Sequence, residues 1–467
     1  MSSISSALSS LLGSSNSSSS IDLSSILEAA FGASSSGIDV QAAVSSAVTA
    51  AEAPQNQWQT QLNTLQSQTS DINQIQSDVS NLDNDMQALN SITGPLSAAS
   101  VTSSNSAVVT ASAAPGSIQA NHVVVVNSLA KTDSWTSNVY ASSTTALPAG
   151  SFTVTGGGGA SATITTDGTE TLSDVANQIN GDSLGVTASV ITDASGARLA
   201  LVANSSGSAN DLTVTGDTGF GFAENQPGAN ASLTVDGINI ASASNTVTGV
   251  IPGVTLNLLG TSQSEVSLSV QPDTSQASSA INQFVTDYNK VISDLNTEFT
   301  FTTGSGQGVL ASDSTIRSLQ TSVLSMLDYS APGNTSVPNL SSLGITVNND
   351  GTLSVDSATL TSTLQNNFSG VQNFFQGTSL NGFANSLDQQ LTSFTDPSNG
   401  AFTLDLQSIS SQETDLQTDI SNFQTNYIQP LQTQLQSEYS QAEILLQELP
   451  NEMKQISAEL GQNNSNG

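Results

Sequence analysis

The stretch INQIQSDVSNLDNDMQAL, residues 72–89, carries the strongest fold signal in the chain. Its apolar residues recur at intervals of 3, 4, 3, 4 and 3, at Ile72, Ile75, Val79, Leu82, Met86 and Leu89. Leu62 and Leu65 extend this stripe toward the N-terminus. A 3.5-residue period keeps one apolar stripe facing a partner helix, as in a coiled coil. An amphipathic helix in an ordinary bundle explains the same spacing, so both interpretations stay open.

A second apolar stripe at helical spacing lies near the C-terminus. It consists of Leu416, Ile420, Phe423 and Tyr427 and, after Pro430, of Leu446, Leu449, Met453, Ile456 and Leu460. Pro450 falls inside this stripe, and we expect a kink or a new helix there because proline cannot donate a helix hydrogen bond. Each stripe needs a partner, and the economical solution is that the two terminal helices pair. We predict that the two stripes form the coiled-coil and self-assembly seam of the protein.

Between these helical ends the hydrophobic period changes to two, which is typical of strands. The strand candidates are residues 121–126, 151–155, 162–166, 185–192, 197–203, 211–215, 231–235, 238–241, 254–259 and 265–270. Asp236-Gly237 predicts a hairpin between two of them, and Thr171 is the expected N-cap of one helix. Helical spacing returns after residue 272, with a hairpin around Asn349-Asp350-Gly351 and helices at about 358–375 and 378–395.

The order helix, sheet, helix predicts an α+β multidomain fold. In this fold the N- and C-terminal helices form a coiled-coil or helical-bundle leg, and a β-rich head is inserted between them. The predicted segments are a flexible Ser-rich tail (1–37), the N-terminal coiled-coil helix of the leg (38–112), a head of two sub-domains (113–272), a helical leg segment with a β-hairpin (273–405), and a C-terminal coiled coil with a flexible tail (406–467).

The composition excludes several classes of protein. The 467 residues include 5 Lys and Arg against 38 Asp and Glu, a net charge of −33, so binding to nucleic acid or to an anionic membrane is not expected. No stretch approaches the ~20 apolar residues of a membrane helix. The first basic residue is Lys131, so we expect no cleaved signal peptide. The absence of cysteine fits a chain that is exported unfolded.

No active site is visible in the sequence. His122 is the one histidine and lies in a Val-rich strand, so we do not expect it to act as the base of a Ser-His-Asp triad. With one histidine and no cysteine, the chain also lacks the ligands of a zinc site. The run 156–159 is read as a glycine loop tip, and 348–351 as a turn rather than a calcium loop. Asp83 and Asp85 flank the first stripe and are interpreted as a solvated face. We therefore expect neither an enzyme nor a cofactor nor a metal site.

Several local motifs resemble those of one protein family. They are SGIDV (36–40) with AEAP (51–54), SLAK (128–131), TLSDVANQIN (171–180) with GVTAS (185–189), LASDSTIR (310–317), and LGIT (343–346) with NDGTL (349–353). In combination with heptads at both ends and a β-rich insertion, they resemble the bacterial flagellar filament cap family, also called flagellar hook-associated protein 2. The resemblance covers roughly residues 30–460.

This resemblance implies a structural assembly protein that caps the distal end of the flagellar filament, promotes folding and polymerisation of exported flagellin, and prevents its loss. It implies a homo-oligomeric ring of about five subunits, a pentamer. The implied partners are flagellin, the hook-associated junction protein and a flagellar export chaperone. The implied location is extracellular, at the filament tip, after type III export without a cleaved signal peptide. The alternatives are a flagellin or hook–filament junction protein, and a surface adhesin or glycan-binding module.

The charge of −33 also bears on assembly. Subunits of one ring repel each other, and salt screens that repulsion. We therefore expect ring assembly to strengthen with ionic strength.

Overall fold

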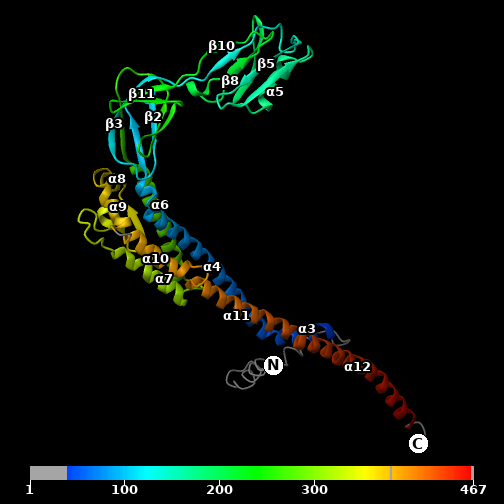
Figure 1. The fold of residues 1–467 in the computed structure, drawn as a ribbon. Helices are drawn as coiled ribbons and strands as arrows, with labels where there is room; N and C mark the ends of the chain where they lie inside the picture. The colour runs from blue at the N-terminus through cyan, green and yellow to red at the C-terminus, as the bar shows by residue number, and fades with distance from the viewer. Residues whose placement is uncertain (1–38, 305, 379–380, 464–467) are drawn as a thin grey trace. The chain divides into compact units, whose positions relative to one another are not determined.

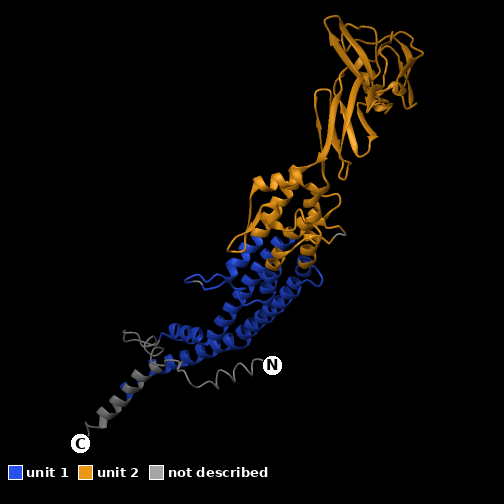
Figure 2. Cartoon of the chain, turned by 90° about the vertical axis from the view of Figure 1, so that its left-hand side faces the viewer, with its two compact units in different colours: residues 1–80, 290–322, 391–467 blue, residues 81–289, 323–390 orange. Residues whose placement is uncertain are grey.

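The computed structural model describes residues 39–304, 306–378 and 381–463. The chain divides into two compact units, which Figure 2 shows in different colours. The first unit comprises residues 1–80, 290–322 and 391–467, and the second comprises residues 81–289 and 323–390. The predicted flexible tail (1–37) lies outside the described residues. Within the described residues, no helix combines the length and apolar character needed to cross a bilayer.

The first unit is helical. Its helices, some of which continue into the second unit, are α3 (Val40–Ala51), α4 (Ala53–Asn90), α6 (Thr274–Phe299), α7 (Ser314–Ser325), α10 (Phe383–Thr395), α11 (Ala401–Phe423) and α12 (Gln429–Asn463). A five-residue π-helical turn, η5 (Gln424–Ile428), joins α11 to α12.

The N-terminal and C-terminal helices of the first unit pack against each other. α3 contacts α12, as Figure 1 shows. Farther along, the Trp58 ring on α4 lies edge-on to the Phe423 ring on α11, with centroids 5.4 Å apart. Thr69 Oγ1 donates to Glu413 Oε1 at 3.1 Å. The predicted pairing of the terminal helices is therefore confirmed.

The two prolines of the C-terminal stripe behave differently from each other. Pro430 follows the π-helical turn, and because it has no N–H for the carbonyl of residue 426, the preceding turn can widen. At Pro450 no new helix begins, because α12 extends unbroken to Asn463. That part of the prediction is wrong: one missing hydrogen bond does not end a helix of 35 residues.

The second unit contains the strands. They are β1 (Ala99–Ser103), β2 (Val109–Ala113), β3 (Ala120–Ser128), β4 (Ser134–Thr136), β5 (Gly150–Thr155), β6 (Ser161–Thr166), β7 (Val186–Asp193), β8 (Gly196–Ala203), β9 (Thr213–Thr215), β10 (Ala223–Gln226), β11 (Ala231–Val235), β12 (Ile238–Ser242), β13 (Thr246–Ile251), β14 (Val254–Leu258), β15 (Val266–Pro272), β16 (Ile345–Val347) and β17 (Leu353–Val355). Its short helices are α5 (Leu172–Gly181), α8 (Ser357–Asn366) and α9 (Phe368–Gln376).

Two antiparallel sheets share one apolar core. Their strand orders are β1-β15-β3-β11-β12 and β13-β14-β2. Val124, Leu233 and Leu256 are among its fully buried side chains. Asp236 and Gly237 both take the left-handed backbone conformation between β11 and β12, so the predicted hairpin turn is confirmed.

Two further antiparallel sheets and α5 enclose a separate core. Their strand orders are β10-β4-β8-β7 and β6-β5-β9. Phe152 and Phe220 meet edge-on at its centre, with ring centroids 4.9 Å apart. Thr171 caps α5 in a capping box with Asp174, which confirms the predicted N-cap. The second predicted hairpin is also present, as β16 and β17.

The sequence patterns missed several strands. β1, β2, β4, β10 and β13 are absent from the candidates, and β1 and most of β2 fall before residue 113, inside the segment predicted to be helical. β1, β2, β4 and β10 contain mostly Ser, Thr, Ala or short polar runs, and Gly249 interrupts the alternation in β13, so these strands lack the regular alternation of large apolar residues that the prediction used. The predicted helix at 358–375 is divided at Asn367 into α8 and α9.

Candidate assembly surface and buried carboxyl groups

The N-terminal apolar stripe lies inside the single chain. Leu62 is 6% exposed, and the other buried members are 2% exposed or less: Ile72, Ile75, Val79, Leu82, Met86 and Leu89. Leu65 is half-buried. The chain's own helices therefore cover most of this stripe, as in an ordinary bundle, and its part in contacts between copies stays a prediction.

The C-terminal stripe is more open. Leu416, Ile420 and Phe423 are half-buried, and Tyr427 is 47% exposed with its ring stacked on Phe423. The side chains of the remaining members lie outside what the structure describes: Leu446, Leu449, Met453, Ile456 and Leu460.

Two exposed apolar side chains on α12 were missed by the heptad count. Ile444 is 57% exposed and Leu445 is 62% exposed. They directly precede the stripe position Leu446, so a count along one seam passes over them. We call Tyr427, Ile444 and Leu445 the C-terminal apolar surface; of these, Ile444 and Leu445 are neighbours in the chain and form the candidate contact site.

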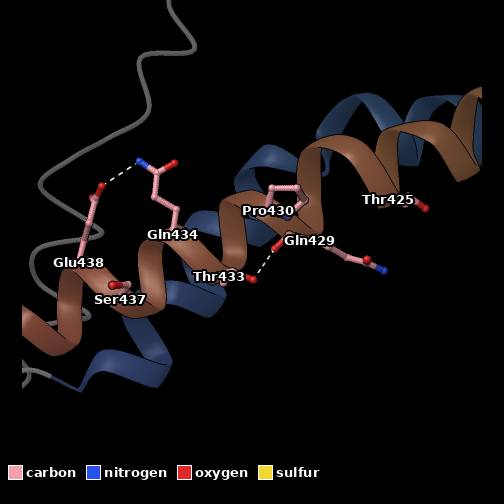
Figure 3. Close-up of a pocket in the computed structure, with 7 residues that line it drawn as sticks. All are labelled: Thr425, Gln429, Pro430, Thr433, Gln434, Ser437 and Glu438. Atoms are coloured by element: carbon pink, nitrogen blue, oxygen red, sulfur yellow. Dashed lines mark hydrogen bonds between the residues drawn. The ribbon is translucent and has the colours of Figure 1, made fainter.

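An open hollow lies on the same part of the first unit (Figure 3). It is lined by Thr425, Gln429, Pro430, Thr433, Gln434, Ser437 and Glu438. Gln434 Nε2 donates to Glu438 Oε1 at 2.8 Å, and Thr433 Oγ1 donates to the carbonyl oxygen of Gln429 at 3.0 Å. Glu438 is the one charged group in this lining, and the hollow holds neither a histidine nor a lysine. Elsewhere in the described residues, no three His, Cys, Asp or Glu side chains are placed to hold a metal ion.

Aspartates of α4 are the most unusual polar groups in the protein. Asp83 is 8% exposed and faces Asp388 of α10, so its interpretation as a solvated residue is wrong. Burial, and then the neighbouring Asp388 carboxyl, raise the pKa of Asp83 to about 7. Asp85 is half-buried opposite Asp287 of α6, and the same two causes raise its pKa to about 7.

The sequence did hold a signal for these buried carboxyl groups. Asp83 follows Val79 by four residues and precedes Met86 by three. Asp85 follows Leu82 by three residues and precedes Leu89 by four. Such spacing places both aspartates beside the buried stripe on one helix. Only the opposing helices, however, decide whether a flanking residue meets water or protein.

A third carboxyl cluster lies in the first unit and includes a cation. Asp78 is 1% exposed and forms an ion pair with Lys290 of α6. Burial pushes the pKa of Asp78 upward, but hydrogen bonds from Lys290, Asp294 and Gln74 outweigh it and lower the pKa. Burial, and then Asp78, raise the pKa of Asp294 to about 6. Elsewhere in this unit, burial and the neighbouring Asp313 raise the pKa of Asp405 to about 6.

His122 occupies a strand position, as predicted. It lies in β3, and its Nδ1 is 2.7 Å from Asp236 Oδ2 in the turn after β11. Asp236 Oδ1 also accepts from the Val123 amide at 2.9 Å. The pair ties the hairpin turn to the neighbouring strand, and its role is structural.

Comparisons with known proteins place the chain in a family. The family model described as "Flagellar hook-associated protein 2 N-terminus" matches residues 36–133, and the one described as "Flagellar hook-associated protein 2 C-terminus" matches residues 228–451. The B-type flagellar hook-associated protein 2 of Pseudomonas aeruginosa is 30% identical over 335 residues, which cover 63% of this chain and 69% of that protein. This chain belongs to the flagellar hook-associated protein 2 family.

Other matches agree with this membership. A flagellin hook IN motif matches residues 151–205. Flagellar hook-associated protein 2 of Escherichia coli K12 is 30% identical over 225 residues, covering 43% of this chain and 48% of that protein. The crystal structure of the D1-D2-D3 domains of the flagellar cap protein FliD from Escherichia coli superposes with a TM-score of 0.59 at 26% identity, covering 73% of this chain and 99% of that chain.

The family membership confirms the predicted fold and role. The chain has terminal helices around a β-rich middle, as this family of flagellar hook-associated proteins does. Its role is that of a flagellar filament cap protein, a structural component of the flagellum. The comparisons do not favour a flagellin, a junction protein or an adhesin.

Proposed function

We propose that this protein forms a homo-oligomeric ring at the distal end of a flagellar filament, where it promotes folding and polymerisation of flagellin and prevents its loss. The observation that carries this proposal is the match to the Escherichia coli cap protein over nearly the whole of that chain. A ring of about five subunits follows from the family resemblance. Flagellin, the hook-associated junction protein and an export chaperone are the proposed partners.

The C-terminal apolar surface supports contacts between subunits or with the filament. Tyr427, Ile444 and Leu445 are each close to half exposed or more in the single chain. Burying apolar side chains of this size releases about 1.5–3 kcal/mol each. A second helix laid against α12 would gain that free energy, as in a coiled coil. The self-assembly seam proposed from the sequence therefore extends to these residues.

We expect the double variant Ile444→Ser/Leu445→Ser to assemble poorly while each subunit stays folded. Mass photometry of the full-length protein would give the subunit count for the parent and the variant. A matched control is Ile118→Ser, because Ile118 is 73% exposed on the second unit. Assembly that the double variant leaves intact would remove this surface from the proposal.

Export is the other part of the proposal. We infer that the chain leaves the cell through the flagellar type III apparatus without a cleaved signal peptide. The absence of cysteine supports this route, because no disulfide can form before or during passage. Mass spectrometry of the protein recovered from sheared filaments would locate its N-terminus, and an N-terminus shortened by a signal-length segment would contradict the inference.

Immunogold electron microscopy of whole cells tests the proposed location. Antibody raised against residues 113–270 would label the β-rich segment. We expect gold at distal filament tips only. Label along the shaft would indicate a flagellin, label at the proximal junction a hook-associated linker, and label away from filaments an adhesin.

A further inference from the structure

Two pairs of aspartates face each other between helices of the second unit. Asp83 of α4 lies opposite Asp388 of α10, and Asp85 of α4 lies opposite Asp287 of α6, each within hydrogen-bonding reach. Asp83 Oδ1, Asp388 Oδ1 and Asp85 Oδ2 are buried and receive no hydrogen bond from any group in the described residues. Each pair therefore brings together oxygen atoms that can only accept when both groups are ionised.

Nearby amides do not resolve this conflict, because they bond to the other oxygens. Gln87 Nε2 donates to Asp83 Oδ2 at 3.1 Å, and Gln283 Nε2 donates to Asp287 Oδ2 at 2.8 Å. Among the described residues, the groups that act on Asp83 are Asp388 and Gln87, and the charged group that acts on Asp85 is Asp287. A proton shared within each pair converts a repulsive contact into a hydrogen bond.

The composition provides an independent observation that also concerns protons. When every carboxyl group is protonated, 5 Lys and Arg and 1 His leave at most six positive side chains in 467 residues. A chain of ordinary composition and equal length would carry about ten times as many cations. Repulsion among positive charges is a main cause of acid unfolding, and this chain is nearly free of it.

We propose that this protein is built to fold in acidic surroundings, and that a proton shared across Asp83–Asp388 and across Asp85–Asp287 holds α4 to α10 and α6. The proposal concerns the medium in which the protein works. It does not depend on the position of the protein on a filament.

The direction of the pH dependence follows from linkage. Burial, and then the opposing carboxyl, raise the pKa of both Asp83 and Asp85 to about 7, above the ordinary value of 3.8. Between these values the folded state holds more protons than the unfolded state. The stabilisation is therefore fully present below pH 3.8 and is lost as pH rises through about 7.

Hydrogen–deuterium exchange of the full-length protein tests this at the level of single helices. Exchange in peptides from α6 and α10 would be compared at pH about 5 and about 7.5, after correction for intrinsic rates. We expect protection to fall by about tenfold or more at the higher pH. Asp83→Asn/Asp85→Asn replaces each shared proton with an amide donor, so its protection should change less with pH than that of the parent, with Asp294 of α6 as the remaining titrating group.

The control is Asp182→Asn/Asp328→Asn, which removes the same charge from exposed positions of the second unit. It should keep the pH dependence of the parent. Equal pH dependence in the parent and in both double variants would overturn the proposal, since general charge repulsion would then explain it.

Infrared spectroscopy provides a readout that does not depend on stability. At pH about 5.5, the parent and the control should show a stronger protonated-carboxyl absorption than Asp83→Asn/Asp85→Asn, in which Asp294 and Asp405 still contribute. Identical spectra for the parent and this variant would overturn the proposal, whatever their stability.

Discussion

At the scale of single residues, the few cations of this protein have specific tasks. Lys290 pairs with the buried Asp78, Arg198 pairs with Asp193 at 3.2 Å, and Arg317 Nη2 donates to the Ala311 carbonyl at 2.7 Å. A cation that neutralises a buried carboxylate matters more than one on the surface, because water solvates the surface charge. Lys290 should therefore be the most sensitive of the three.

We predict that Lys290→Met destabilises the protein by about 1–3 kcal/mol at neutral pH, because it leaves Asp78 buried without a cation. The pKa of Asp78 is lowered in the parent, so the stabilisation it provides is present above pH 3.8 and is lost as pH falls through the lowered value. The difference between variant and parent should therefore shrink in acid. Urea unfolding followed by circular dichroism at two pH values would measure it.

Lys131→Met is the matched control for this experiment. Lys131 is exposed, and its hydrogen bonds with Ala229 are made by backbone atoms. Its loss should cost a few tenths of a kcal/mol at most. Equal effects of the two variants would mean that the ion pair contributes nothing specific.

At the scale of elements, α5 depends on its first turn. Thr171 Oγ1 accepts from the Asp174 amide at 3.3 Å, and Asp174 Oδ2 accepts from the Thr171 amide at 2.9 Å. We predict that Thr171→Ala destabilises this region by about 1 kcal/mol. Trp135 packs against the same core, so its fluorescence would report the unfolding. Thr171→Ser keeps the hydroxyl and should restore most of the loss; a serine variant as unstable as the alanine variant would count against the cap.

The sequence predicted those elements whose signal is contained in one segment. The spacing from Ile72 to Leu89 requires only that one side of a helix is buried, and the structure buries it. The cap at Thr171 and the turn at Asp236 likewise involve neighbours in the chain. Segments such as β4 and β10 become strands only because other strands pair with them, so their own residues did not predict them.

The candidate site could be predicted only in part, for the same reason. Asp83 looked like a solvated residue because Asp388, which faces it, lies far along the chain on α10. Ile444 and Leu445 were passed over because the heptad count followed one seam. Which side chains meet another helix, and which meet water, depends on tertiary packing and not on local spacing.

At the scale of the whole molecule, net charge controls association. Each subunit carries a charge of −33, and like-charged subunits approach one another more easily when salt screens them. We predict that the assembled fraction rises between about 20 mM and about 500 mM NaCl at neutral pH. Analytical ultracentrifugation of the full-length protein would measure it, with uncharged sucrose as the control for cosolute effects. Steady dissociation with added salt would show that attractive charge pairs dominate instead.

The π-helical turn at 424–428 affects how this chain tolerates changes in length. A π-turn holds one more residue than an α-helical turn, so the helix after it faces the same way as in an α-helix that is one residue shorter. Removing a single residue from this turn would restore ordinary α-helix and leave the buried faces of α11 and α12 close to their present orientation. The same one-residue deletion in the middle of α4 would turn the stripe at Ile72–Leu89 away from its neighbours by about 100°. Of the two long helical segments, the C-terminal one can therefore lose a residue at this turn and still present its contacts.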